Sequence, residues 1–313
     1  MTKEQPVPGT NIKQVEAAER SEIVKVKSYR IDLDLTTGAE NFRVKTTVAF
    51  AGLKPGATTF IDCVGSKVIS AKLNGVEFDP KFDGETIYLP AIAAENVLEI
   101  EHDGIYSNTG EGLHRFVDPA DNEVYLYTQF EVPDSRRMFA VFEQPDLKAL
   151  FTFIVTAPEN WKVVSNQPTP ESVSIGDSKA KWHFAPTPKI SSYITALVAG
   201  PYVETRSQLT SSDGRTIPLG VYCRASLAPF MDADYIFDKT REGFTFFEKQ
   251  FDVPYPFEKY DQLFVPEFNA GAMENAGAVT FTETYVFRSK VSDATKERRV
   301  VTILHELAHM WFG

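Results

Sequence analysis

Hydrophobic and polar side chains alternate along most of the first two hundred residues, which is the pattern of β-strands with one buried face. Asn74-Gly75 separates two short apolar segments, and both residues tolerate the positive φ angles of a type I′ hairpin turn. Many short strands separated by Pro, Gly and Asn predict an antiparallel sandwich or saddle. Strands are expected at residues 29–35, 42–50, 71–73, 76–78, 97–101, 123–130, 150–156, 161–164, 181–184 and 193–198.

The hydrophobic period changes to that of helices after the turn-rich residues 210–214. One amphipathic helix is expected to end before Pro254, with Ala233, Phe237, Thr240, Phe244, Phe247 and Phe251 on its apolar face. A second helix is expected to begin at Ser292 or Asp293, either of which can cap it. Its apolar side is predicted to carry Val300, Val301, Leu304, Leu307, Ala308 and Trp311. A β-rich domain over residues 1–203, followed by a mixed α/β domain over 204–313, is the organisation that these patterns predict.

Composition excludes several classes of protein. Of 313 residues, 43% are hydrophobic and 24% are charged, which argues against collagenous, low-complexity and disordered chains. The formal net charge of −11 makes nucleic acid a poor partner, because phosphate binding needs an excess of basic side chains. Residues 1–20 lack the apolar core of a signal peptide, and no stretch is long and apolar enough for a membrane span. We therefore expect a cytoplasmic protein without a membrane partner; the oligomeric state is not indicated.

The second helix ends in His305-Glu306-Leu307-Ala308-His309, which is the pattern HExxH. Four residues of helix turn through about 400°, so both imidazoles lie on one face and can share a metal ion, for which zinc is suited. Glu306 is rotated about 100° from His305 and can take a proton from a water that the metal activates. The alternative is a pair of surface histidines beside a glutamate, which the apolar surroundings disfavour.

The segment Gly271-Ala272-Met273-Glu274-Asn275 lies upstream of this helix, after the strand-like residues 262–265. Alone it would be a turn or edge strand with one acidic residue. Together with HExxH it resembles the zinc aminopeptidase N family of gluzincin metallopeptidases, whose motifs are GAMEN and HExxH.

A third segment strengthens this resemblance, which runs from about Tyr29 to Gly313. Residues 127–131, 134–137 and 142–148 are similar to the family's TQFE, DARR and FDEPDLK signature. The resemblance implies a thermolysin-like catalytic domain, incomplete in this chain, after the β-rich domain. It implies a zinc-dependent aminopeptidase acting on peptides with a free N-terminus.

The resemblance also assigns roles to individual residues. His305 and His309 would bind Zn²⁺, and Glu306 would be the catalytic base. The substrate's α-ammonium group would be held by Gln129, Glu131 and Glu274, because that cation needs carboxylate and amide oxygens. Gly271, Ala272, Met273 and Asn275 complete the substrate-binding set; the Gly271-Ala272 backbone would lie against the substrate and Met273 would line the first side-chain pocket.

A rival hypothesis is a non-catalytic binding module with a vestigial zinc site. Catalytic zinc normally has three protein ligands, and this sequence shows two. In the family, the third is a glutamate on the next helix, and a later tyrosine stabilises the oxyanion. Since Gly313 lies four residues after His309, we expect both beyond residue 313 and expect the isolated chain to be poorly active.

Other candidate residues carry little chemistry. His102, His114 and His183 are isolated, and we interpret them as surface residues or hydrogen-bonded core residues. Cys63 and Cys223 are too few for a disulfide framework and are expected to be buried thiols. No GxSxG nucleophile elbow is present.

Overall fold

A computed structural model describes residues 12–312, which form two compact units that interleave along the sequence. The first unit contains residues 12–106, 130–156 and 186–193, and the second contains 107–129, 157–185 and 194–312. Because these units alternate along the chain, they do not test the expected domain boundary at residue 203, which stays a prediction.

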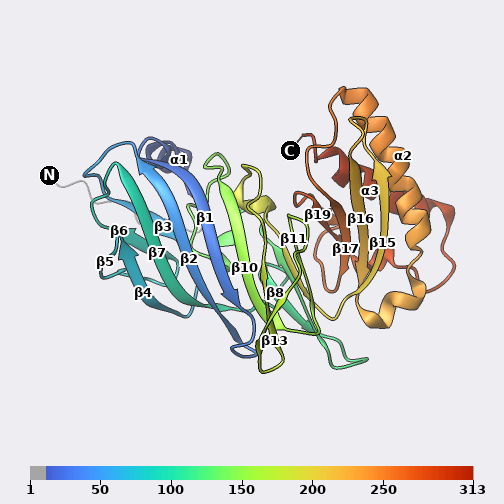
Figure 1. Cartoon of the computed structure of the whole chain (residues 1–313), viewed down its shortest axis with the longest axis horizontal. Coiled ribbons are helices and arrows are strands. Elements are labelled where there is room, and N and C mark those ends of the chain that lie inside the picture. Colours follow the sequence, from blue (N-terminus) through green and yellow to red (C-terminus); the bar gives the residue numbers. More distant parts are fainter. Residues whose placement is uncertain (1–11, 313) are drawn as a thin grey trace. The chain divides into compact units, whose positions relative to one another are not determined.

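The first unit is built on strands that run in the order β10-β1-β2-β7-β4-β5 (Figure 1). Their bounds are β1 (Val24–Asp34), β2 (Asn41–Gly52), β4 (Lys67–Leu73), β5 (Val76–Glu77), β7 (Glu95–Ile105) and β10 (Leu150–Pro158). On β2, Phe42, Val44, Val48 and Phe50 are fully buried together with Thr46, while the residues that alternate with these five are partly exposed. This strict alternation fixes the register of the central strand pair, because a one-residue slip would expose its whole apolar face.

The predicted strand-rich class is confirmed for this unit, and two details differ from expectation. Asn74 and Gly75 have φ angles of 53° and 81°, which confirms the β4–β5 hairpin turn. However, β10 pairs with β1 in parallel, so the sheet is not wholly antiparallel. The small pair β3 (Thr59–Asp62) and β6 (Thr86–Leu89) and helix α1 (Gln14–Ser21) were not predicted. Residues 1–11, where the absence of a signal peptide was partly inferred, lie outside the described residues.

The second unit contains a four-stranded antiparallel sheet with the order β11-β14-β9-β8. Its strands are β8 (Gly112–Val117), β9 (Val124–Gln129), β11 (Lys162–Ser165) and β14 (Leu197–Gly200), and β12 (Val173–Gly176) pairs with β13 (Lys179–His183). The strand expected at 193–198 is only partly correct, because Ser192–Ile194 form a 3-10 turn and β14 begins at Leu197.

A five-stranded mixed sheet follows in the same unit, in the order β15-β16-β17-β19-β18. Its strands are β15 (Val203–Thr210), β16 (Thr216–Cys223), β17 (Tyr260–Val265), β18 (Ala272–Met273) and β19 (Ala278–Thr282). The parallel pairs β16–β17 and β17–β19 form its centre, and the three core strands are buried along most of their length. Helices α2 (Ala233–Phe251) and α3 (Asp293–Ala308) lie against this sheet (Figure 1).

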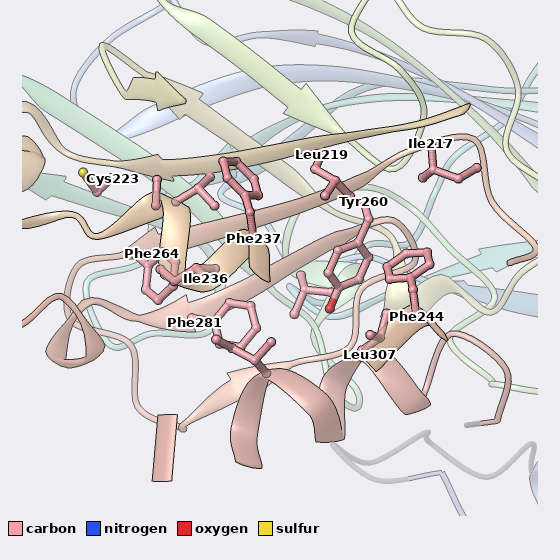
Figure 2. Packing of buried hydrophobic residues seen from close by; sticks show 14 of the residues in the cluster. Ile217, Leu219, Cys223, Ile236, Phe237, Phe244, Tyr260, Phe264, Phe281 and Leu307 are labelled. Atoms are coloured by element: carbon pink, nitrogen blue, oxygen red, sulfur yellow. The ribbon is translucent and has the colours of Figure 1, made fainter. Parts of the chain in front are cut away.

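Side chains from β16, β17, β19, α2 and α3 meet in one hydrophobic core (Figure 2). Helix α2 ends at Phe251, as predicted, and Ser292 caps α3 by accepting the backbone N–H of Thr295. The predicted apolar side of α3 is partly wrong, since Val301 is 56% exposed. The buried residues near the helix end follow a spacing of three and four; they are Arg299, Ile303, Glu306, Leu307 and Met310.

Among residues 12–312, no helix combines the length and apolar character that crossing a bilayer requires. Both cysteines are buried and unbonded, as expected.

His102, on β7, is a core residue whose interpretation needs correction. It is fully buried, but neither ring nitrogen has a hydrogen-bond partner in the described part of the chain. Burial lowers the pKa of His102 to about 4, and the nearby charge of Asp103 only partly opposes this effect. The imidazole is therefore neutral and stays so well below neutral pH.

We predict that His102 makes the free energy of unfolding fall as the pH drops from about 6.5 to 4. The unfolded chain protonates this imidazole near its ordinary pKa of 6.5, whereas the folded protein does so only near about 4. Below pH 6.5 the unfolded state therefore binds more protons, and about 3 kcal/mol of stability is lost by pH 4. Urea unfolding should show a flatter pH dependence for His102→Leu than for the exposed control His183→Leu; equal slopes would contradict the account.

Candidate active site

The end of α3 brings two imidazoles together. The Nε2 atoms of His305 and His309 are 3.2 Å apart, with ring centroids at 4.8 Å. Two bonds of about 2.0–2.1 Å from tetrahedral zinc to nitrogen place the nitrogens roughly 3.3 Å apart, so the pair fits two adjacent zinc ligands. Within residues 12–312 no third His, Cys, Asp or Glu joins them. The two imidazoles could thus supply two of the three protein ligands that a catalytic zinc site normally has.

The orientation of His309 favours a ligand role for its Nε2 atom. Its Nδ1 atom lies 3.0 Å from the carbonyl oxygen of Phe312. A carbonyl oxygen only accepts hydrogen bonds, so Nδ1 carries the proton in the neutral ring and Nε2 carries the lone pair. A hydrogen bond of this kind holds the tautomer and the ring orientation of many metal-bound histidines.

Glu306 lies between the two histidines in sequence but faces inward. His305 is exposed and His309 is half-buried, whereas Glu306 is only 5% exposed. Burial, together with the charge of Glu306, raises the pKa of Tyr260 on β17. The carboxylate therefore lies near the core beneath α3, where charges interact more strongly than they do in bulk water.

A buried arginine on the same helix fixes where α3 lies within the second unit. The guanidinium of Arg299 donates to both carboxylate oxygens of Asp232 at 2.7 and 2.8 Å, and to the carbonyl of Tyr285 at 3.1 Å. It also lies over the rings of Phe287 and Tyr235, at 4.5 and 5.2 Å. Asp232 is the N-cap residue of α2, so the Arg299 side chain joins the start of α2 to the middle of α3.

The predicted GAMEN segment forms the edge of the five-stranded sheet. Ala272 and Met273 constitute β18, which pairs with β19 on one side only. The N–H of Thr282 donates to the carbonyl of Gly271 and extends this pairing. Among residues 12–312 no strand pairs with the other edge of β18, and an extended peptide can add to an edge of this kind as a further strand.

The side chains of this segment point to different surroundings. Met273 is buried, while Glu274 is half-buried and has no hydrogen-bond or ion-pair partner among residues 12–312. Asn275 is buried and its amide donates to the hydroxyl of Thr280 at 3.2 Å, within the same sheet. The substrate-binding roles predicted for these residues stay predictions.

Asn166 holds the residue that follows the GAMEN segment. Its amide nitrogen donates to the carbonyls of Ala276 and Ile194, both at 2.9 Å, and its oxygen accepts the N–H of Ala196. The side chain is buried and uses its donors and acceptor on backbone groups. It thereby connects the end of β11 to the sheet edge.

Gln129 is the last residue of β9, which belongs to the same unit as the GAMEN segment. Its side chain is half-buried, and its Oε1 atom is shielded from solvent without a hydrogen-bond partner in the described residues. An unsatisfied amide oxygen is an available acceptor for an ammonium group. Glu131 is exposed and belongs to the first unit, so its convergence with Glu274 stays a prediction.

A second buried arginine connects the hairpin of β8 and β9 to the five-stranded sheet. Arg224 donates from Nε and Nη2 to the two oxygens of Glu283, at 2.7 and 2.9 Å, and from Nη1 to Asp118 at 2.6 Å. Hydrogen bonds to Glu283 raise the pKa of Arg224 further above its ordinary value, so it stays charged. At the same hairpin, the hydroxyl of Tyr125 accepts the N–H of Ala225.

Sequence reasoning missed these positioning residues. Arg224 and Asp118 are separated by 106 positions, and Asn166 and Ala276 by 110. No local pattern links partners at such separations. The only signal was Arg299 inside a helical apolar period, because a buried arginine needs a partner for its charge.

Comparison with known proteins agrees with the geometry. Residues 25–194 match the model of the Peptidase M1 N-terminal domain, and residues 235–313 match that of the Peptidase family M1 domain. Aminopeptidase N of Streptomyces lividans is 56% identical over 312 residues, which cover 98% of this chain and 36% of the relative. Leucyl aminopeptidase of Saccharolobus solfataricus is 30% identical, over 93% of this chain and 36% of the relative. The chain thus spans about a third of the length of these curated relatives.

We predict that Arg299→Ala lowers the free energy of unfolding by about 2–3 kcal/mol, because charge-assisted hydrogen bonds to Asp232 and Tyr285 are lost. The neighbouring Arg298 is exposed, and Arg298→Ala should stay within about 0.5 kcal/mol of the unsubstituted chain. Urea unfolding measures both. Equal stability of the two variants would show that Arg299 does not hold α3.

Proposed function

Because the chain belongs to peptidase family M1, we propose that it is part of a zinc-dependent aminopeptidase, which removes N-terminal residues from peptides. The observation that carries this proposal is the pair of imidazole Nε2 atoms 3.2 Å apart at the end of α3, beside a buried glutamate. The GAMEN edge strand in the same unit supports a peptide substrate. The names of the relatives, aminopeptidase N and leucyl aminopeptidase, agree with it.

His305 and His309 would hold the zinc ion through Nε2. When bound, zinc supplies Lewis-acid chemistry to the scissile carbonyl and to a water molecule. The carboxylate of Glu306 then takes a proton from the attacking water and delivers it to the departing amine nitrogen. Burial keeps this carboxylate away from competing bulk water.

The remaining candidate residues orient the peptide. The free edge of β18 accepts the substrate backbone as an added strand, with Gly271 and Ala272 alongside it and Met273 at the first side-chain pocket. Glu274 has no partner in the described part of the chain and is proposed to bind the α-ammonium group, together with Gln129 and Glu131. The selection for a free N-terminus would come from these acceptors. A cytoplasmic location stays a prediction from the sequence.

We predict that Glu306→Gln reduces hydrolysis of an aminoacyl anilide by about 10²–10⁴-fold in the parent protein, since the amide cannot accept the proton. Zinc content, measured by metal analysis, should be unchanged because Glu306 is not a ligand in this proposal. Glu297→Gln, at an exposed position of the same helix, is the matched control and should retain activity. Undiminished activity of Glu306→Gln would remove Glu306 from its role. A parent protein without chelator-sensitive hydrolysis would instead favour the binding module with a vestigial site.

We also predict weak zinc binding by the 313-residue chain alone, because residues 12–312 bring together two ligands instead of three. Zinc should be lost during dialysis against a mild chelator, and anilide hydrolysis should be low. His305→Ala should remove the residual binding, and the exposed control His183→Ala should not. Tight stoichiometric zinc together with substantial, chelator-sensitive hydrolysis by this chain would refute the prediction.

A further inference from the structure

We propose that His114 is a positioning residue for the substrate-binding edge strand. With Tyr127 it holds the turn of residues 266–270, which leads directly into the GAMEN segment. This inference rests on the proposed aminopeptidase function and adds a determinant of substrate affinity that lies outside its motifs. The hairpin of β8 and β9 would thereby set both Gln129 and β18 in place.

His114 is completely buried, and both of its ring nitrogens are used. Nδ1 accepts the backbone N–H of Gly110 at 3.0 Å, so the proton of the neutral ring is on Nε2. Nε2–H then donates to the Oε2 atom of Glu267 at 3.0 Å. One imidazole therefore forms a hydrogen bond with a loop of its own hairpin on one side and with the turn before β18 on the other.

Tyr127, on the neighbouring strand β9, contacts a backbone group of the same turn. Its hydroxyl donates to the carbonyl of Glu267 at 3.1 Å, and its ring meets Phe268 edge-on at 5.6 Å. The ring of His114 lies 4.8 Å from that of Tyr127, so the two side chains support each other. The side-chain amide of Asn269 also donates to the carbonyl of Thr109.

These contacts stabilise a backbone conformation that the turn would not adopt easily by itself. Glu267 has a φ angle of 53°, in the left-handed region that is unfavourable for a residue with a side chain. Gly110 has a φ angle of 87°, and a Cβ atom there would lie 2.3 Å from the amide nitrogen of Asn269. The hairpin loop and the turn before β18 are thus in close contact and cannot shift independently.

The position of this contact explains its importance for substrate binding. Glu267 precedes Ala272, the first residue of β18, by five positions, so the turn sets where the edge strand begins. Gln129 follows Tyr127 by two positions on β9, and residues two apart on a strand share a face. A displaced turn would therefore change the spacing between the Gln129 amide and the free edge of β18.

The neutral form of His114 suits this role. Burial lowers its pKa, and the hydrogen bond and charge of Glu267 only partly oppose that effect. Protonation would place a second N–H on Nδ1, opposite the Gly110 N–H, and would break that contact.

The test uses Glu267→Ala, because this side chain is exposed and its removal leaves no cavity in the core, and Glu267→Gln as the conservative variant. In the parent enzyme, KM for leucine p-nitroanilide should rise about tenfold in Glu267→Ala and in His114→Phe, with kcat within about threefold. The inhibition constant of 3-methylbutylamine, an ammonium ligand without a carbonyl group, should rise by the same factor. Glu267→Gln keeps an acceptor for Nε2–H and should retain both constants.

The controls are Glu258→Ala and His183→Phe, which alter exposed residues of the same types. Values of KM and of the amine inhibition constant within twofold of wild type in Glu267→Ala would overturn the proposal while leaving the aminopeptidase function intact. A loss of kcat at unchanged KM would overturn it as well, because positioning of the ammonium site would then not be affected. A wild-type parent without chelator-sensitive hydrolysis would refute the proposed function and this inference together.

Discussion

The arrangement of the second unit depends on the buried ion pairs of Arg224. One guanidinium contacts Asp118 in the turn between β8 and β9, and Glu283 directly after β19. All three charges are largely removed from solvent, so the carboxylates need the arginine and the arginine needs both of them. Their contacts join the hairpin that carries Gln129 to the sheet that carries the GAMEN segment.

From this junction the contacts continue to α3, the helix that carries His305 and His309. Glu283 begins the 3-10 turn that ends at Tyr285, whose carbonyl accepts Arg299 and whose hydroxyl lies 2.9 Å from that of Thr302 on α3. The middle of the helix is thus held by polar contacts, and its buried side packs on the hydrophobic core of Figure 2. At the end of the helix His305 is exposed and His309 is half-buried, which agrees with the metal site proposed for them.

Much of the fold and the site could be predicted from the sequence because the signals are local. The spacing within His305–His309 places two imidazoles on one helical face, and the structure brings their Nε2 atoms together. The alternation of buried and exposed residues on β2 and the turn at Asn74-Gly75 could likewise be predicted from neighbouring residues alone. The parallel pairing of β10 with β1 and the contact of His114 with Glu267, 153 positions away, could not be predicted. Such contacts depend on how distant segments pack, and no periodicity records them.

The central claim is that His305 and His309 bind a catalytic zinc ion beside Glu306. Anomalous diffraction at the zinc edge, from crystals of the parent protein, tests it most directly. The account predicts a single peak about 2.1 Å from the Nε2 atoms of both histidines. A zinc-loaded, active protein with no peak at that position, or with its only peak at other residues, would contradict the account.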